Sequence, residues 1–217
     1  MATSPFRTRL QARERLLGTL VQTAHPDVAR RLAAQGFDWL FLDGEHGGYG
    51  PAEAAATLQA LNGAVPCLLR VPSQAPEVLD ATAACGADGL IVPHVDTPEQ
   101  AAAVVRQVRG RGLVVVQAES REAVAHIQAI ARVPGVDAVF VGPYDLSASL
   151  GAPEQFDHPD LLAALAAITT ACRDANMPLG LFRMTAAEIR PWEPAGFTLL
   201  AVGVDGTPLE ELRGKNN

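Results

Sequence analysis

The chain has 217 residues, of which 48% are hydrophobic and 19% charged, and its formal net charge is −7. This composition suits one α/β domain with a sizeable core, and it argues against a general nucleic-acid binder, whose affinity would depend on clustered Lys and Arg. No apolar run approaches the length of a membrane span, and the N-terminus lacks the apolar stretch of a signal peptide. We therefore expect a cytoplasmic protein that binds neither nucleic acid nor membrane.

Apolar runs and amphipathic segments alternate along the whole chain. The apolar runs predict strands at 17–21, 39–42, 67–69, 90–92, 113–116, 138–141, 179–182 and 198–202. Helical spacing predicts helices at 26–35, 51–61, 76–86, 98–108, 121–132 and 159–175, a short helix from 185 and a short last helix at 209–213. Residues 1–14 are an N-terminal segment, and 214–217 are expected to be a frayed tail.

Eight strands, each followed by a helix, predict a single (β/α)₈ barrel over residues 1–217. The alternative is an open doubly wound sheet, which would need a nucleotide-binding fingerprint. Neither GxGxxG after the first strand nor GxxxxGK[ST] occurs. The barrel is therefore the expected fold.

Polar and ionisable residues gather at the carboxyl ends of the predicted strands. They are Gln22, Asp43, Glu45, His46, Arg70, His94, Gln117, Glu119, Asp145, Arg183 and Asp205. In a barrel these strand ends form one mouth, where catalytic groups are found. The placement predicts an active site there.

Glu119 and Asp145 each follow a buried-looking strand, and one helix connects the two strands. A right-handed crossover would bring both strand ends to the same edge of the sheet, so the two carboxylates would lie side by side. Converging carboxylate oxygens suit a hard divalent cation. Each acid alone also fits a helix N-cap or a solvated loop, which is the simpler alternative.

Arg70 and His46 are the expected basic and proton-transferring groups. Arg70 would project from the third strand and hold a carboxylate or stabilise an oxyanion, although a structural ion pair fits the spacing equally well. His46 lies in the loop DGEHGGYG, where it would move a proton near neutral pH or be a plain surface histidine. For His94 we expect packing behind the site.

Other candidates would support substrate or metal. Asp43 and Glu45 point the same way if strand geometry continues, so one would serve the site and the other a cap or a salt bridge. Gln117 shares a face with Glu119 and is expected to support the metal ligand or the substrate. Gly142 and Tyr144 flank Pro143 at a bend, where main-chain N–H groups would bind an anion.

A resemblance to the HpcH/HpaI family of class II pyruvate aldolases is carried by the segments FDWLFLDGEH, LLRVP, GADGLIVPHVDTPEQAAAVV, VVVQAESREAV and GVDAVFVGPYDLSASLG. It extends from about Gly18 to Asp205. The resemblance implies a (β/α)₈ barrel and a homo-oligomer, typically a hexamer built from dimers that exchange the eighth helix. It also implies Mg²⁺, Mn²⁺ or Co²⁺ held by Glu119 and Asp145.

The resemblance further implies cleavage of a 4-hydroxy-2-oxo acid to pyruvate and an aldehyde through a pyruvate enolate. Arg70 would neutralise the enolate oxygen and His46 would transfer the proton of the hydroxyl. Substrate would be bound by Gln117, Asp43 and the backbone from Gly142 to Asp145, including Tyr144. No lysine stands at a strand end, which argues against a Schiff base.

Three features depart from the family pattern. The connection between the fourth helix and the fifth strand is short, the last helix is short, and Ala84 replaces an acid that supports the histidine, with Asp80 as a partial substitute. The alternatives are therefore related enolate chemistry, such as oxaloacetate decarboxylation or a specialised condensation, and a non-catalytic barrel that binds small acids.

Overall fold

The structure is a computed structural model, and it describes residues 5–206. Within this range eight parallel strands pair in chain order, and β8 pairs with β1 to close a barrel. The strands are β1 (Leu16–Val21), β2 (Trp39–Asp43), β3 (Cys67–Arg70), β4 (Gly89–Val92), β5 (Leu113–Ala118), β6 (Ala138–Val141), β7 (Leu179–Arg183) and β8 (Phe197–Val204). The predicted fold class is confirmed.

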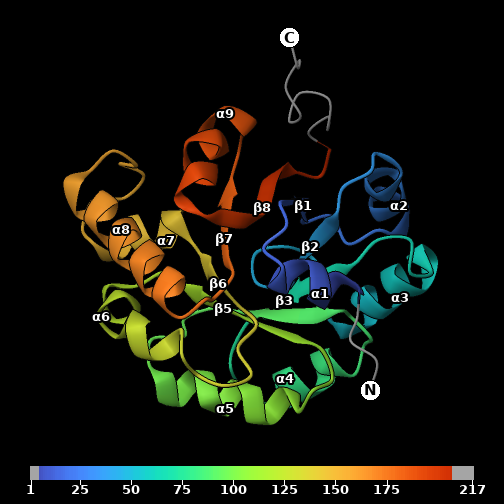
Figure 1. The fold of residues 1–217 in the computed structure, drawn as a ribbon. Coiled ribbons are helices and arrows are strands. Elements are labelled where there is room, and N and C mark those ends of the chain that lie inside the picture. Colours follow the sequence, from blue (N-terminus) through green and yellow to red (C-terminus); the bar gives the residue numbers. More distant parts are fainter. Residues whose placement is uncertain (1–4, 207–217) are drawn as a thin grey trace.

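Helices surround the strands in a ring (Figure 1). They are α1 (Pro5–Gln11), α2 (Pro26–Ala34), α3 (Pro51–Leu61), α4 (Pro76–Ala83), α5 (Pro98–Val108), α6 (Arg121–Ile130), α7 (Pro143–Ser149), α8 (Pro159–Asp174) and α9 (Ala186–Ile189), followed by the 3₁₀ turn η1 (Arg190–Ala195). Many begin with proline, because its fixed φ and missing N–H suit the first helical turn. None of the helices in residues 5–206 is long and apolar enough to cross a bilayer.

The barrel interior is filled by aromatic side chains. Phe140 meets both Trp39 and Phe41 edge to face, with ring centroids 6.3 and 5.6 Å apart. Two glycines make room for these rings, since a Cβ on Gly180 would lie 2.3 Å from Phe140 and one on Gly18 would lie 2.5 Å from Trp39. The interior is thus a packed core rather than a channel, as in other barrels.

Helix α1, which the sequence did not predict, covers the amino-terminal end of the barrel. Its buried Phe6 and Leu10 join the apolar cluster of the interior. Arg7 pairs with Asp137, directly before β6, and Arg9 pairs with Asp38, directly before β2. These contacts close the end opposite the polar strand ends.

Helix α7 was also missed, because Gly142 and Pro143 were interpreted as a bend. The short connection before the fifth strand is confirmed, since α5 ends at Val108 and β5 begins at Leu113. The predicted last helix at 209–213 and the predicted frayed tail at 214–217 lie outside the described residues.

Candidate active site

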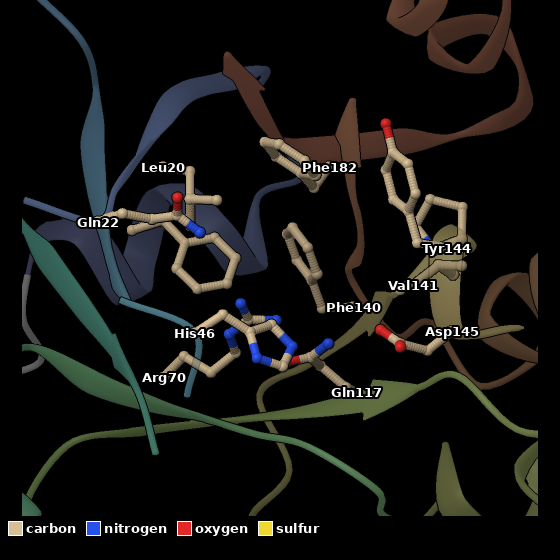
Figure 2. Close-up of a pocket in the computed structure, with 13 residues that line it drawn as sticks. Leu20, Gln22, His46, Arg70, Gln117, Phe140, Val141, Tyr144, Asp145 and Phe182 are labelled. Carbon is tan, nitrogen blue, oxygen red and sulfur yellow. The ribbon is translucent and has the colours of Figure 1, made fainter. Parts of the chain in front are cut away.

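A cavity of about 210 Å³ lies at the carboxyl ends of the strands (Figure 2). Its walls include six of the predicted site residues, namely His46, Arg70, Gln117, Gly142, Tyr144 and Asp145. In Figure 2 the side chains of His46, Arg70 and Gln117 lie together, and the Asp145 carboxylate points toward this group. Apolar side chains line the rest of the cavity, with Phe41 and Phe140 among them.

Arg70 reaches this cavity from the end of β3 and is held by two carboxylates. Its Nε and Nη2 donate to Asp43 at 2.9 and 2.8 Å, and its Nη1 lies 3.1 Å from Glu45 Oε2. A guanidinium carries five N–H donors; two of them are hydrogen-bonded to Asp43 and Nη1 pairs with Glu45, so donors remain for a ligand. The structural ion pair and the ligand-binding role are therefore compatible.

Asp43 lies fully buried behind Arg70 and does not line the cavity. Its oxygens accept hydrogen bonds from Arg70, from the side chain of Gln22, and from the main-chain N–H groups of Glu45 and His46. Burial raises the pKa of Asp43, but the hydrogen bonds and charge of Arg70 outweigh this and lower it. Asp43 is placed to orient Arg70 and the loop that carries His46.

Glu119 follows β5 and is almost completely buried, with 3% of its surface exposed. The main-chain N–H of His94 donates to its Oε1 at 2.8 Å, and Gln117 Nε2 donates to its Oε2 at 2.6 Å. Burial raises the pKa of Glu119 to about 7; the His94 hydrogen bond opposes this, and the charges of Asp145 and Glu45 add to it.

Asp145 stands in the first turn of α7 and is exposed. Because β5 and β6 are neighbours, with Ala118 opposite Val141, the chain segments that follow them meet. A Cβ on Gly142 would lie 2.6 Å from Glu119 Oε2, so a glycine is needed for this close approach. The charge of Asp145 contributes to the raised pKa of Glu119, and the expected proximity of the two carboxylates stays a prediction.

The donor set fits a divalent cation that keeps open positions. Within residues 5–206 no group of three or more His, Cys, Asp or Glu side chains forms a ready metal cage. However, Gln117 Oε1 is buried and accepts no hydrogen bond in the described structure, directly beside the buried Glu119 carboxylate. Mg²⁺ often binds through one or two carboxylates, and substrate and water oxygens complete its shell.

His46 has an exposed ring whose Nε2 lies 3.7 Å from Glu45 Oε2. Asp80, the expected partial substitute for the missing acid, does not take that place. It pairs with Arg111 and accepts a hydrogen bond from Gln107. The carboxylate beside the His46 ring is therefore that of Glu45.

Two residues at the mouth lie differently from what the sequence suggested. His94, expected to pack behind the site, has a 62% exposed ring whose Nδ1 is 3.1 Å from Glu119 Oε1. Arg183 points out of the barrel and stacks on Phe156 at 4.1 Å, because successive strand residues face opposite sides and Phe182 faces the cavity. The position of His94, two residues after the end of β4, was the signal that could have placed it at the mouth.

A closed (β/α)₈ barrel with acidic groups, a guanidinium and an imidazole around one cavity defines a barrel enzyme. The HpcH/HpaI aldolase/citrate lyase family profile matches residues 17–211. The chain belongs to this family. Its relatives include named aldolases, so this chain is an aldolase, an enzyme of the lyase class.

Among its relatives is a hydroxypyruvate/pyruvate aldolase of Sagittula stellata, 34% identical over 93% of this chain and 92% of the relative. A 5-keto-4-deoxy-D-glucarate aldolase of Klebsiella pneumoniae is 31% identical over 92% and 90%. A crystal structure of an HpcH/HpaI aldolase/citrate lyase family protein from Burkholderia cenocepacia matches with a TM-score of 0.89 and 30% identity, over 94% and 93%. The first alignment has 236 positions, more than the 217 residues of this chain, so that relative carries residues that this chain lacks.

Proposed function

We propose that this chain is a metal-dependent aldolase that cleaves a 4-hydroxy-2-oxo acid to pyruvate and an aldehyde. The observation that carries the proposal is the buried Glu119 carboxylate, with Asp145 and the unsatisfied Gln117 oxygen beside it. A buried negative charge of this kind requires a compensating cation or a proton. The relative from Sagittula stellata is a hydroxypyruvate/pyruvate aldolase, which supports a reaction that forms or uses pyruvate.

Glu119 and Asp145 would hold the cation, which is Mg²⁺, Mn²⁺ or Co²⁺ in this proposal. When bound, the cation supplies positive charge beside the oxygen on which the enolate charge develops. Arg70 would also stabilise the negative charge on the enolate oxygen. It would donate hydrogen bonds through the N–H groups that Asp43 and Glu45 leave unused.

His46 would remove the proton from the C4 hydroxyl of the substrate. The C3–C4 bond then breaks, the hydroxyl oxygen becomes the carbonyl oxygen of the aldehyde, and the electron pair of the broken bond enters the enolate. A proton returned to C3 completes pyruvate. His46 is placed for this role because its ring is exposed at the cavity, with Nε2 3.7 Å from Glu45 Oε2.

Substrate orientation would come from the remaining cavity residues. The main-chain N–H groups from Gly142 to Asp145 would bind the substrate carboxylate, and the side chains of Gln117 and Tyr144 would border it. Asp43 contributes indirectly in this proposal, because it orients Arg70 and contacts no open space.

Oxaloacetate decarboxylation is a second candidate. It would use the same Glu119, Asp145 and Arg70, and it needs no group that handles an aldehyde or its proton. Decarboxylation releases CO₂ from the same enolate and needs no base for a hydroxyl proton. The two reactions therefore differ in their need for His46.

One assay separates the candidates. The Mn²⁺-loaded protein is incubated with oxaloacetate, and separately with pyruvate and short aldehydes, with and without a chelator; Glu119→Gln is the matched control. Chelator-sensitive carbon–carbon bond formation supports the aldolase, and decarboxylation alone supports the second candidate. A folded protein that binds pyruvate but turns over neither substrate mixture would be a non-catalytic acid-binding barrel.

We also propose that the protein is a cytoplasmic homo-oligomer, up to a hexamer built as a trimer of dimers. Light scattering on the purified full chain tests the assembly, and a monomer at all concentrations would contradict it.

A further inference from the structure

His94 holds the Glu119 carboxylate at two points. Its main-chain N–H donates to Oε1 at 2.8 Å, and its ring Nδ1 lies 3.1 Å from the same oxygen. On the other side of the ring, Nε2 lies 3.5 Å from Glu45 Oε1. The imidazole thus separates two carboxylates that would otherwise face each other unscreened.

The backbone at this position is unusual. His94 adopts φ +55°, a left-handed conformation that is unfavourable for an L-residue other than glycine. Such a conformation persists when the surroundings impose it, and it clusters at functional sites. Here Gln74 Nε2 contacts this segment by donating to the carbonyl oxygens of Pro93 and His94 at 3.0 and 2.6 Å.

The opposite oxygen of Glu119 is fixed as well. Gln117 Nε2 donates to Oε2 at 2.6 Å, so each carboxylate oxygen has its own partner. With both oxygens tethered, the plane of the carboxylate is set before any cation arrives. The remaining lone pairs of these oxygens are then available in a fixed direction.

We propose that His94 is a positioning residue for Glu119, and that its ring sets how tightly the site binds a divalent cation. This inference rests on the metal site of the proposed function. Groups that hydrogen-bond a metal-ligating carboxylate orient it, and their loss typically weakens metal binding by about 10–100-fold. We expect a loss of this size when the ring is removed.

The test measures Mn²⁺ affinity by the loss of the free-ion electron paramagnetic resonance signal, which does not depend on turnover. His94→Gly removes the ring and relieves the left-handed strain, while the main-chain N–H remains. His94→Asn keeps a short side-chain donor in a residue that tolerates this conformation. His25→Gly is the matched control, because His25 is also 62% exposed but pairs with Asp27.

We expect His94→Gly to weaken Mn²⁺ binding about 10–100-fold, His94→Asn to recover part of it, and His25→Gly to bind like the wild type. Equal affinity in the wild type and His94→Gly would overturn the role of His94 and leave the metal site intact. An Asn variant no better than the Gly variant would overturn the hydrogen-bond argument. A wild type that binds Mn²⁺ no better than Glu119→Gln would overturn the metal site and this inference together.

Discussion

Arg70 and Asp43 meet through two parallel hydrogen bonds, Nε to Oδ1 at 2.9 Å and Nη2 to Oδ2 at 2.8 Å. Their side chains are 9% and 0% exposed, so water screens neither charge well. The β2–β3 register places the two residues directly opposite each other. This geometry fixes the plane of the guanidinium at the cavity wall.

Asp43→Ala should destabilise the protein by about 3–5 kcal/mol, because it leaves the Arg70 charge buried with only Glu45 beside it. Urea unfolding measures the loss. The exposed pair of Arg30 and Asp27 provides the control, and Asp27→Ala should change stability by about 1 kcal/mol or less. Equal losses in both variants would show that the buried pair has no special role.

Glu119→Gln should stabilise the metal-free protein at alkaline pH but not at acid pH. The folded pKa of Glu119, about 7, lies above its ordinary value of 4.5, so only the unfolded chain ionises as pH rises between them. The wild-type fold loses about 3 kcal/mol over that window, and glutamine removes the loss. Urea unfolding across this pH range checks the difference, which should vanish as pH falls below 4.5. Saturating Mn²⁺ should stabilise only the wild type.

Gly142→Ala should abolish Mn²⁺ binding and turnover while the fold survives. Gly142 has φ −95°, which alanine adopts freely, so the cost comes from the contacts of the new Cβ, which would lie 2.6 Å from Glu119 Oε2, 3.1 Å from Glu119 Cβ and 3.2 Å from Gln117 Nε2. Circular dichroism and Mn²⁺ titration separate these effects. In the control Gly50→Ala the new Cβ meets only the flexible end of Glu53, so activity should persist. Full activity of Gly142→Ala would mean that Glu119 is not confined there.

His46→Ala should impair aldol cleavage by about 10²–10⁴-fold and spare oxaloacetate decarboxylation, because only the first reaction removes a hydroxyl proton. Parallel assays of both reactions with Mn²⁺ measure the ratio. If both rates fall together, His46 binds substrate rather than transferring a proton.

The barrel was predictable because its strands, buried on both faces, form continuous apolar runs. Three predicted strands ended one residue too early, because main-chain pairing continues past the last apolar residue to Asp43, Arg70 and Arg183. The short helices α1 and α7 were missed for a physical reason. Helices of seven residues are marginal alone and depend on packing, which local spacing does not encode.

The site was predictable in its location but not in its pairings. Placement at strand ends identified Glu119 and Arg70, and period-two alternation would also have directed Arg183 away from the cavity. The link from Arg70 to Asp43 depends on the β2–β3 register. The left-handed backbone of His94 is contacted by Gln74, which lies twenty residues away in sequence, so no local pattern indicates this contact.

Helix α1 gives the barrel a closed base, with Phe6 and Leu10 seated among the inner side chains. Within residues 5–206 the base of the barrel therefore offers no exit, so both fragments of a cleaved substrate would depart at the carboxyl ends of the strands, where their parent entered. In the proposed reaction Arg70 holds pyruvate, so added pyruvate should compete with fresh substrate for the empty enzyme.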